Sequence, residues 1–189
     1  MRRLFPAAVV AAAAGLAAGP EAARAEQQIH FQSELVRAIQ AGDADKVQRV
    51  LMGDTTPNQT GADGEPVLQH AVRQGNKKIL RVLLKNGARP DYTGETGETA
   101  LHEAARQGRP AMAGQLIEAG AGLEAPDDQG RTPLIVAAAN GHMETLNALL
   151  DAGADPRATD YTGRTAVAYA RRNGNRAVAA RLKRATGDG

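Results

Sequence analysis

Gly-Arg-Thr-Pro-Leu-Ile-Val-Ala-Ala-Ala-Asn-Gly-His, residues 130–142, is the stretch that the rest of the chain repeats. Its landmark residues recur every 33 positions in both directions, and no insertion or deletion interrupts the register. A strict period of this length predicts a solenoid, because so small a unit buries its apolar face only by stacking on its neighbours. The equivalent landmarks are Gly64, Gly97, Gly130 and Gly163; Leu35, Leu68, Leu101, Leu134 and Val167; Ala38, Ala71, Ala104, Ala137 and Ala170; and Gly42, Gly75, Gly108, Gly141 and Gly174.

The signals within one unit predict two short antiparallel helices. In the fourth unit Thr132 is placed to cap the first helix, and Pro133 fits the first helical position, where a missing N–H is not needed. Gly141 marks the turn, and a second apolar stripe ends in Leu149–Leu150 before Gly153, where a helix stop is expected. The Pro-, Gly-, Asp- and Thr-rich segments between units predict loop or hairpin fingers that project from an all-α stack.

The composition predicts a core of small aliphatic side chains. The chain has 189 residues, 42% of them hydrophobic, with no Trp and only two Phe. Ala, Leu, Val and Ile must therefore fill the interior through close helix–helix contacts. The chain also contains no Cys, which excludes disulfides, thiol catalysis and cysteine metal sites.

Residues 1–25 have the character of a bacterial secretory signal peptide. A basic start at Arg2 and Arg3 precedes an Ala-rich apolar region, and Ala23-Arg24-Ala25 fits a small-x-small cleavage site. The apolar run is short for a membrane span, so we expect cleavage and no stable membrane insertion of the mature protein; an uncleaved anchor is the alternative. Residues 1–25 also carry the surplus positive charge, because the remaining chain has equal numbers of basic and acidic residues.

The repeated motif resembles that of the ankyrin-repeat family. The family signature is Gly-x-Thr-Pro-Leu-His-x-Ala-Ala-x-x-Gly-His, followed by Leu-Leu and Gly-Ala-Asp, and residues 130–142 follow it with Leu149–Leu150 and 153–155. Two departures are Ile135 where the family has His and Ala100 where it has Pro. The resemblance implies an all-α ankyrin-repeat solenoid of about five helix-turn-helix repeats with hairpin or loop fingers, and a concave protein-binding groove formed by the fingers and the inner helices.

The expected layout follows from this register. A lead-in at 26–32 separates the signal peptide from the ankyrin-repeat domain at 33–185, and a tail follows at 186–189. The repeats are expected at about 33–60, 61–93, 94–126, 127–159 and 160–185. The last repeat carries Lys183 where earlier repeats have the second Leu of a pair, which fits a polar terminal unit.

The candidate partner-binding residues are those that the register leaves without a structural role, at the finger tips and at the exposed ends of the inner helices. Arg, with its planar donor fork, and Tyr are typical interface anchors, although a solvated charged surface is the simpler alternative. The twelve predicted residues are Arg73, Gln74, Glu95, Glu98, Arg106, Gln107, Asp128, Arg131, Asn140, Tyr161, Arg164 and Arg172.

Charge is uneven along the repeats. Eight acidic residues lie between Asp91 and Asp128, whereas the stretch from Arg164 to Arg184 has seven basic residues and no acidic one. This asymmetry would orient a charged partner, although polar capping and favourable contacts of cations with helix C-termini explain it equally well. The basic stretch has no interleaved aromatic pattern, so nucleic acid is not an expected partner.

No catalytic or cofactor motif is present in the sequence. The four His residues are far apart, none lies at i,i+4 from another, and His102 is expected to bond within the stack, so we predict no metal site and no cofactor. Ser33 is the only Ser and lies in no nucleophile elbow. We therefore expect a non-enzyme.

The function expected from these features is protein binding by a chain that is monomeric when unbound. The predicted signal peptide places it in the bacterial periplasm, with secretion as the alternative, where it would inhibit, protect or assemble a partner protein. The other functions considered are a secreted effector or structural spacer and, further from the pattern, a small-ligand carrier or an enzyme.

Overall fold

The computed structural model describes residues 34–61 and 63–187, so the predicted signal peptide, the whole predicted lead-in and the last two residues of the predicted tail lie outside the described residues. Residues 34–40 are helical. The elements that follow are α2 (Ala44–Leu51), α3 (Val67–Gln74), α4 (Lys77–Lys85), α5 (Ala100–Arg106), α6 (Pro110–Glu118), α7 (Pro133–Asn140), α8 (Met143–Asp151), α9 (Ala166–Arg172) and α10 (Arg176–Thr186).

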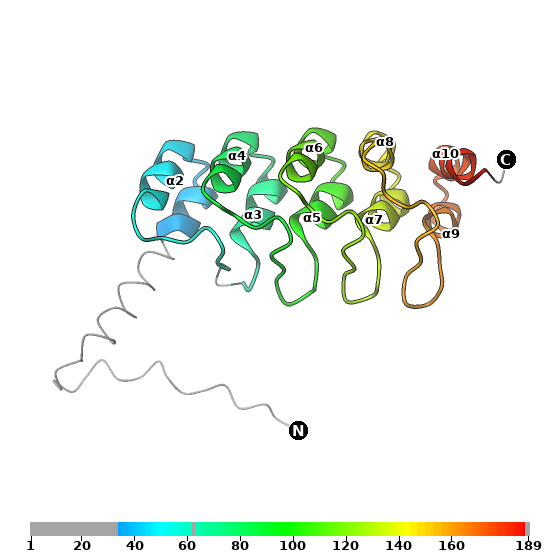
Figure 1. The fold of residues 1–189 in the computed structure, drawn as a ribbon, viewed down its shortest axis with the longest axis horizontal. Coiled ribbons are helices and arrows are strands. Elements are labelled where there is room, and N and C mark those ends of the chain that lie inside the picture. The colour runs from blue at the N-terminus through cyan, green and yellow to red at the C-terminus, as the bar shows by residue number, and fades with distance from the viewer. Residues whose placement is uncertain (1–33, 62, 188–189) are drawn as a thin grey trace, which may run out of the picture.

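The helices form two parallel rows (Figure 1). The inner row contains α3, α5, α7 and α9, the outer row contains α2, α4, α6, α8 and α10, and the loops between repeats project together beyond the inner row. Each inner helix packs against the outer helix of its own repeat and against the next inner helix. The all-α solenoid predicted from the 33-residue period is confirmed. In the described part of the chain the fingers hold two isolated β-bridges, Thr60–Pro66 and Thr159–Thr165, and no named strand.

Thr residues cap three of the four labelled inner helices, including α7, whose cap the sequence predicts at Thr132; α3 begins after Pro66 with no side-chain cap. The hydroxyl of Thr132 accepts a hydrogen bond from the N–H of Ile135, with Pro133 as the first helical residue, and Thr99 and Thr165 cap α5 and α9 in the same way. These hydroxyls satisfy N–H groups that have no partner inside the helix. Gly141 then ends α7 with φ 78°, a left-handed conformation that favours Gly.

Small aliphatic side chains fill the core, and one register position is the closest point between repeats. Leu101 and Leu134 are buried, and so are the Ala pairs one turn further along α5 and α7, Ala104–Ala105 and Ala137–Ala138, which are buried completely. At the turn of the third repeat the imidazole of His142 lies over Gly108, where a Cβ atom would be 2.5 Å from Nδ1. Gly174 occupies the same register position in the fifth repeat and has open space above it.

This difference predicts unequal costs for two matched substitutions. Both Gly108 and Gly174 have positive φ, 63° and 77°, so Ala strains the backbone similarly at either site, by about 1–2 kcal/mol. Gly108→Ala additionally drives a methyl group into the His142 ring, which we expect to cost a further ~1–3 kcal/mol. Chemical denaturation of both variants measures the difference, and equal losses of stability would contradict the packing described here.

Candidate binding groove

A hollow of about 300 Å³ lies between two neighbouring fingers, at residues 63–66 and 94–98, next to the inner helices α3 and α5. The finger residues Glu65, Glu95 and Glu98 line one side of it, and Arg73 and Arg106 reach it from the inner helices. Of the predicted binding residues, the fold therefore brings Arg73, Glu95, Glu98 and Arg106 together around one concavity.

The charged side chains of this groove pair with one another. The buried carboxylate of Glu103, on α5, lies 3.4 Å from Arg73 Nε and 3.6 Å from Arg106 Nε. Arg106 also pairs with Glu98, and Arg73 Nη2 lies 2.5 Å from Glu65 Oε1. These pairs join neighbouring repeats into a ladder of alternating charge, and breaking a buried pair leaves an uncompensated charge.

Arg131 extends the ladder into the fourth repeat. Its Nη2 lies 2.7 Å from Asp127 Oδ2 and 3.6 Å from Glu98 Oε1. The expectation that Arg73, Glu98, Arg106 and Arg131 are free of structural contacts is therefore wrong, because carboxylates from their own or an adjacent repeat lie within reach.

Burial and partners shift the pKa values of the ladder in different directions. Burial raises the pKa of Glu65 above its usual value, against the opposing effect of Arg73. Burial alone would also raise the pKa of Asp127, but hydrogen bonds from Arg131 and from the N–H of Gln129 outweigh it and lower the pKa. For Arg106, burial is outweighed by Glu98 and Glu103, and the pKa is raised.

The remaining amide residues of the predicted set hold local contacts. Gln107 donates to Glu103 over 2.8 Å, and Asn140 donates to the carbonyl of Val136, also over 2.8 Å. Gln74 makes a longer bond, 3.4 Å, to the carbonyl of Gln40. Their side chains thus support the ends of the inner helices instead of being unengaged.

The finger tips stack on one another in register. Glu95, Asp128 and Tyr161 are equivalent positions, and each lies over the Gly at the tip of the preceding finger, namely Gly64, Gly97 and Gly130. A Cβ atom on Gly130 would be 2.5 Å from the Tyr161 ring, yet Tyr161 remains 72% exposed. Gly at these positions therefore permits the close stacking that aligns the tips in a row.

Buried Asp residues shape the last two fingers. Asp160 Oδ1 accepts hydrogen bonds from the N–H groups of Thr162 and Arg164, and Asp160 Oδ2 accepts from the hydroxyl of Tyr169 over 2.7 Å. Burial alone would raise the pKa of Asp160, but these donors outweigh it and hold the pKa well below its usual range. Asp127 accepts the equivalent two N–H groups one repeat earlier. Asp160 therefore holds the finger that carries Tyr161 and Arg164 in a fixed conformation.

The fifth repeat presents the predicted residues that are not paired. Arg164 and Arg172 are exposed, and neither forms an ion pair within the described residues. Together with the exposed Tyr161 they are available for another molecule, as are Glu95 and Asp128 at the preceding finger tips, which are also exposed.

Comparison with known families now adds to this geometry. The family described as ankyrin repeats (3 copies) matches residues 35–127 and 115–187, which together span most of the chain. The chain belongs to the ankyrin-repeat family. Ankyrin repeats are in general protein–protein interaction modules and are typically non-catalytic. The comparison with curated proteins gave no match.

The ankyrin-repeat His position bonds between repeats, as the sequence predicts for His102. His102 is fully buried; the N–H of Thr99 donates to Nδ1 over 3.1 Å, and Nε2 donates to the carbonyl of Arg131 over 2.9 Å. Gln69 replaces His one repeat earlier and donates to the equivalent carbonyl, that of Glu98. Burial lowers the pKa of His102, because an imidazolium would lose its hydration.

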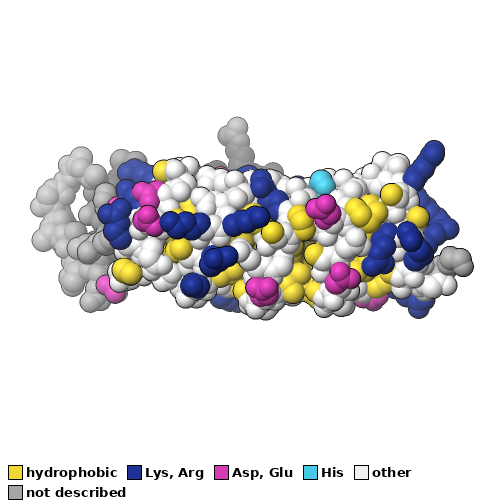
Figure 2. Space-filling model, turned by 90° about the horizontal axis from the view of Figure 1, so that it is seen from above, with side chains coloured by type: hydrophobic (Ala, Val, Ile, Leu, Met, Phe, Trp, Pro, Cys, Tyr) yellow, Lys and Arg dark blue, Asp and Glu magenta, His cyan; other side chains and the backbone are white. Residues whose placement is uncertain are grey.

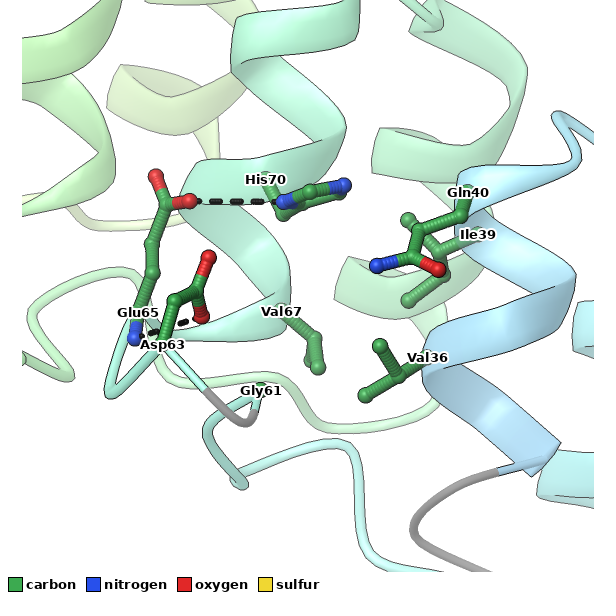
Figure 3. Close-up of a pocket in the computed structure, with 8 residues that line it drawn as sticks. All are labelled: Val36, Ile39, Gln40, Gly61, Asp63, Glu65, Val67 and His70. Carbon is green, nitrogen blue, oxygen red and sulfur yellow. Dashed lines mark hydrogen bonds and ion pairs between the residues drawn. The ribbon is translucent and has the colours of Figure 1, made fainter.

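One cluster in this ankyrin-repeat chain has the chemistry of a metal site (Figure 3). Ligand atoms of Asp63, Glu65 and His70 lie within 4.8 Å of one another, and Glu65 Oε2 is 3.3 Å from His70 Nδ1. The prediction of no metal site is based on the spacing between His residues and therefore does not consider this set, which links a finger to α3. Glu65 is already paired with Arg73, so the ion pairs account for the arrangement. Separately, none of the described helices is both long and apolar enough to cross a membrane.

The buried His102 predicts a loss of stability on mild acidification. The pKa in the folded state lies below the ordinary value of 6.5, so the unfolded state binds the proton more tightly. This contribution is complete above pH 6.5 and is lost as the pH falls from there towards the lowered pKa, by up to ~1.4 kcal/mol per pH unit.

His102→Gln isolates this effect, because Gln at the equivalent position 69 keeps the bond to the next repeat. Melting temperatures between pH 7.5 and pH 5 are expected to fall more steeply for the wild type than for the variant. The other His residues of the chain are the same in both proteins, so the comparison isolates position 102. Parallel pH profiles would show that His102 does not carry the effect.

Proposed function

We propose that this ankyrin-repeat protein binds a partner protein in the bacterial periplasm through its finger tips and the open end of its groove. The proposal is carried by the exposure of Tyr161, Arg164 and Arg172 in one repeat, where neither Arg forms an ion pair within the described residues. Aromatic and Arg side chains are enriched at interface hot spots.

The ion-pair ladder supports a division of roles along the groove. Arg73, Arg106 and Arg131 are held by carboxylates, so a partner would have to displace existing pairs to use them. Arg164 and Arg172 require no such exchange, and they favour a partner with an acidic surface at this end. Glu95 and Asp128 continue the row of tips towards the middle of the chain, where a partner's cations would fit.

The periplasmic part of the proposal rests on the sequence of residues 1–25. In the periplasm the protein acts as an inhibitor, a protector or an assembly factor of its partner. The alternative function is that of a secreted effector or a structural spacer. Fractionation of the producing cells distinguishes a periplasmic protein from a secreted one. Cleavage after Ala25 gives a mature protein beginning at Glu26, which mass spectrometry of the periplasmic fraction checks; retention of the full chain would contradict export by cleavage.

The assignment of Tyr161, Arg164 and Arg172 to the binding surface predicts a selective loss of partner binding when they are changed. A triple variant, Tyr161→Ala, Arg164→Ala and Arg172→Ala, is compared with the mature chain by capture from a periplasmic extract and then by affinity for the purified partner. Loss of one aromatic and two Arg anchors is expected to weaken binding by at least about tenfold.

A matched control changes the same kinds of side chain elsewhere. Met52 is 75% exposed, and Lys77 and Lys85 are exposed on α4, so Met52→Ala, Lys77→Ala and Lys85→Ala removes one apolar group and two cations. This control is expected to bind like the wild type. Equal affinity of the two triple variants for every partner would refute the assignment.

A further inference from the structure

The open face of the fifth repeat contains a recess of about 380 Å³ between its finger, α9 and α10. Three cations line it: Arg157 from the finger, Arg171 from α9 and Lys183 from α10. The hydroxyl-bearing residues Thr165 and Thr186 also line it, and no acidic residue among residues 34–61 and 63–187 does. Figure 2 shows Lys and Arg side chains gathered at this end of the molecule.

Two of these cations occupy positions that are apolar in the other repeats. Arg171 stands where the preceding repeats have Val72, Ala105 and Ala138, all of which are buried. Lys183 stands where they have Leu84, Ile117 and Leu150, which pack against the core. The face that each earlier repeat presents to its successor has therefore become positively charged in the fifth.

The third cation, Arg157, is a hydrogen-bond donor at a position where the earlier repeats have an acceptor. At the position of Arg157 the earlier repeats have Asn58, Asp91 and Glu124, whose side-chain oxygens accept an N–H from the following repeat. Arg157 donates instead, from Nη2 to the carbonyl of Thr186 over 2.6 Å. Its guanidinium has five N–H donors, so others remain for a second acceptor.

The last repeat needs a polar outer face, but that need does not explain why all three charged residues of the recess are positive. Three like charges around one recess repel one another, and Gln, Glu or Thr would keep the face wet without that cost. Cations near helix C-termini are favourable, which suits Arg171 and Lys183 in the last turns of α9 and α10, but Arg157 lies in a finger. Within the described residues, moreover, Arg171 and Lys183 have no carboxylate partner.

We propose that this recess binds a small anion bearing a phosphate or sulfate group. Two Arg forks provide bidentate donors of the geometry that oxyanions accept, the Lys adds a third charge, and the hydroxyl of Thr165 adds a neutral donor, whereas that of Thr186 already donates to the carbonyl of Lys183. A group with at least two negative charges fits this donor set better than a single carboxylate does. The site lies on the end face, away from Tyr161 and the finger tips, so it is independent of the proposed protein-binding groove.

Titration with pyrophosphate tests the site, using calorimetry on the mature chain at low salt. We expect saturable binding that weakens about tenfold in Arg171→Gln and in Lys183→Gln, since each loses a charge-assisted hydrogen bond. Arg184→Gln is the matched control, because Arg184 is exposed next to Lys183 but does not line the recess, so the change removes one positive charge outside it. It is expected to bind as the wild type does.

The controls also define the results that would overturn the proposal. Absence of saturable binding by the wild type would do so, as would equal weakening in all three variants, which indicates general charge screening. A second experiment measures sedimentation of the protein with vesicles of anionic phospholipid. If the protein sediments with the vesicles but does not bind pyrophosphate, the face binds a membrane surface and the proposal is contradicted. Circular dichroism melting curves confirm that the variants remain folded.

Discussion

The structure depends on a hydrogen bond that each repeat makes to the end of an inner helix in the preceding one. The last carbonyl groups of a helix have no partner within it, and burying them unpaired is costly. Here the side chain that follows the turn Gly reaches back to them: His142 to the carbonyl of Arg106, and Arg109 to that of Arg73. Asn175 makes the equivalent bond to the carbonyl of Ala139, and Asn76 bonds to the carbonyl of the turn residue Gly42. Different side chains serve the same role, so the constraint is on reach and register.

That constraint limits where function can reside. Hydrogen bonds between the repeats hold the groove in a fixed shape and position its charged residues. Glu103 is the clearest case: it is buried under two Arg residues of adjacent repeats and supports the groove from below. A groove built in this way offers a partner a pre-organised surface, which reduces the entropy cost of association.

The sequence predicts the elements of this fold well and the contacts of its site less well. Thr132, Pro133 and Gly141 carry local signals whose physical meaning does not depend on context, and their predicted positions are confirmed. Arg73 and Glu103 are 30 residues apart and at different register positions, so no periodic comparison pairs them. The same holds for Asp63 and His70, which meet because a finger folds back onto α3. Pairings of this kind depend on side-chain reach across the stack.

The cations of the end face also bear on the length of the assembly. A solenoid whose last unit exposes an apolar stacking surface can join another copy end to end, and such head-to-tail contacts generate open filaments. Here a second copy stacked on this face would have to bury Arg171 and Lys183, and burying a charge costs free energy unless it is paired. These two residues therefore make end-to-end stacking less favourable than it would be on the apolar face of an earlier repeat.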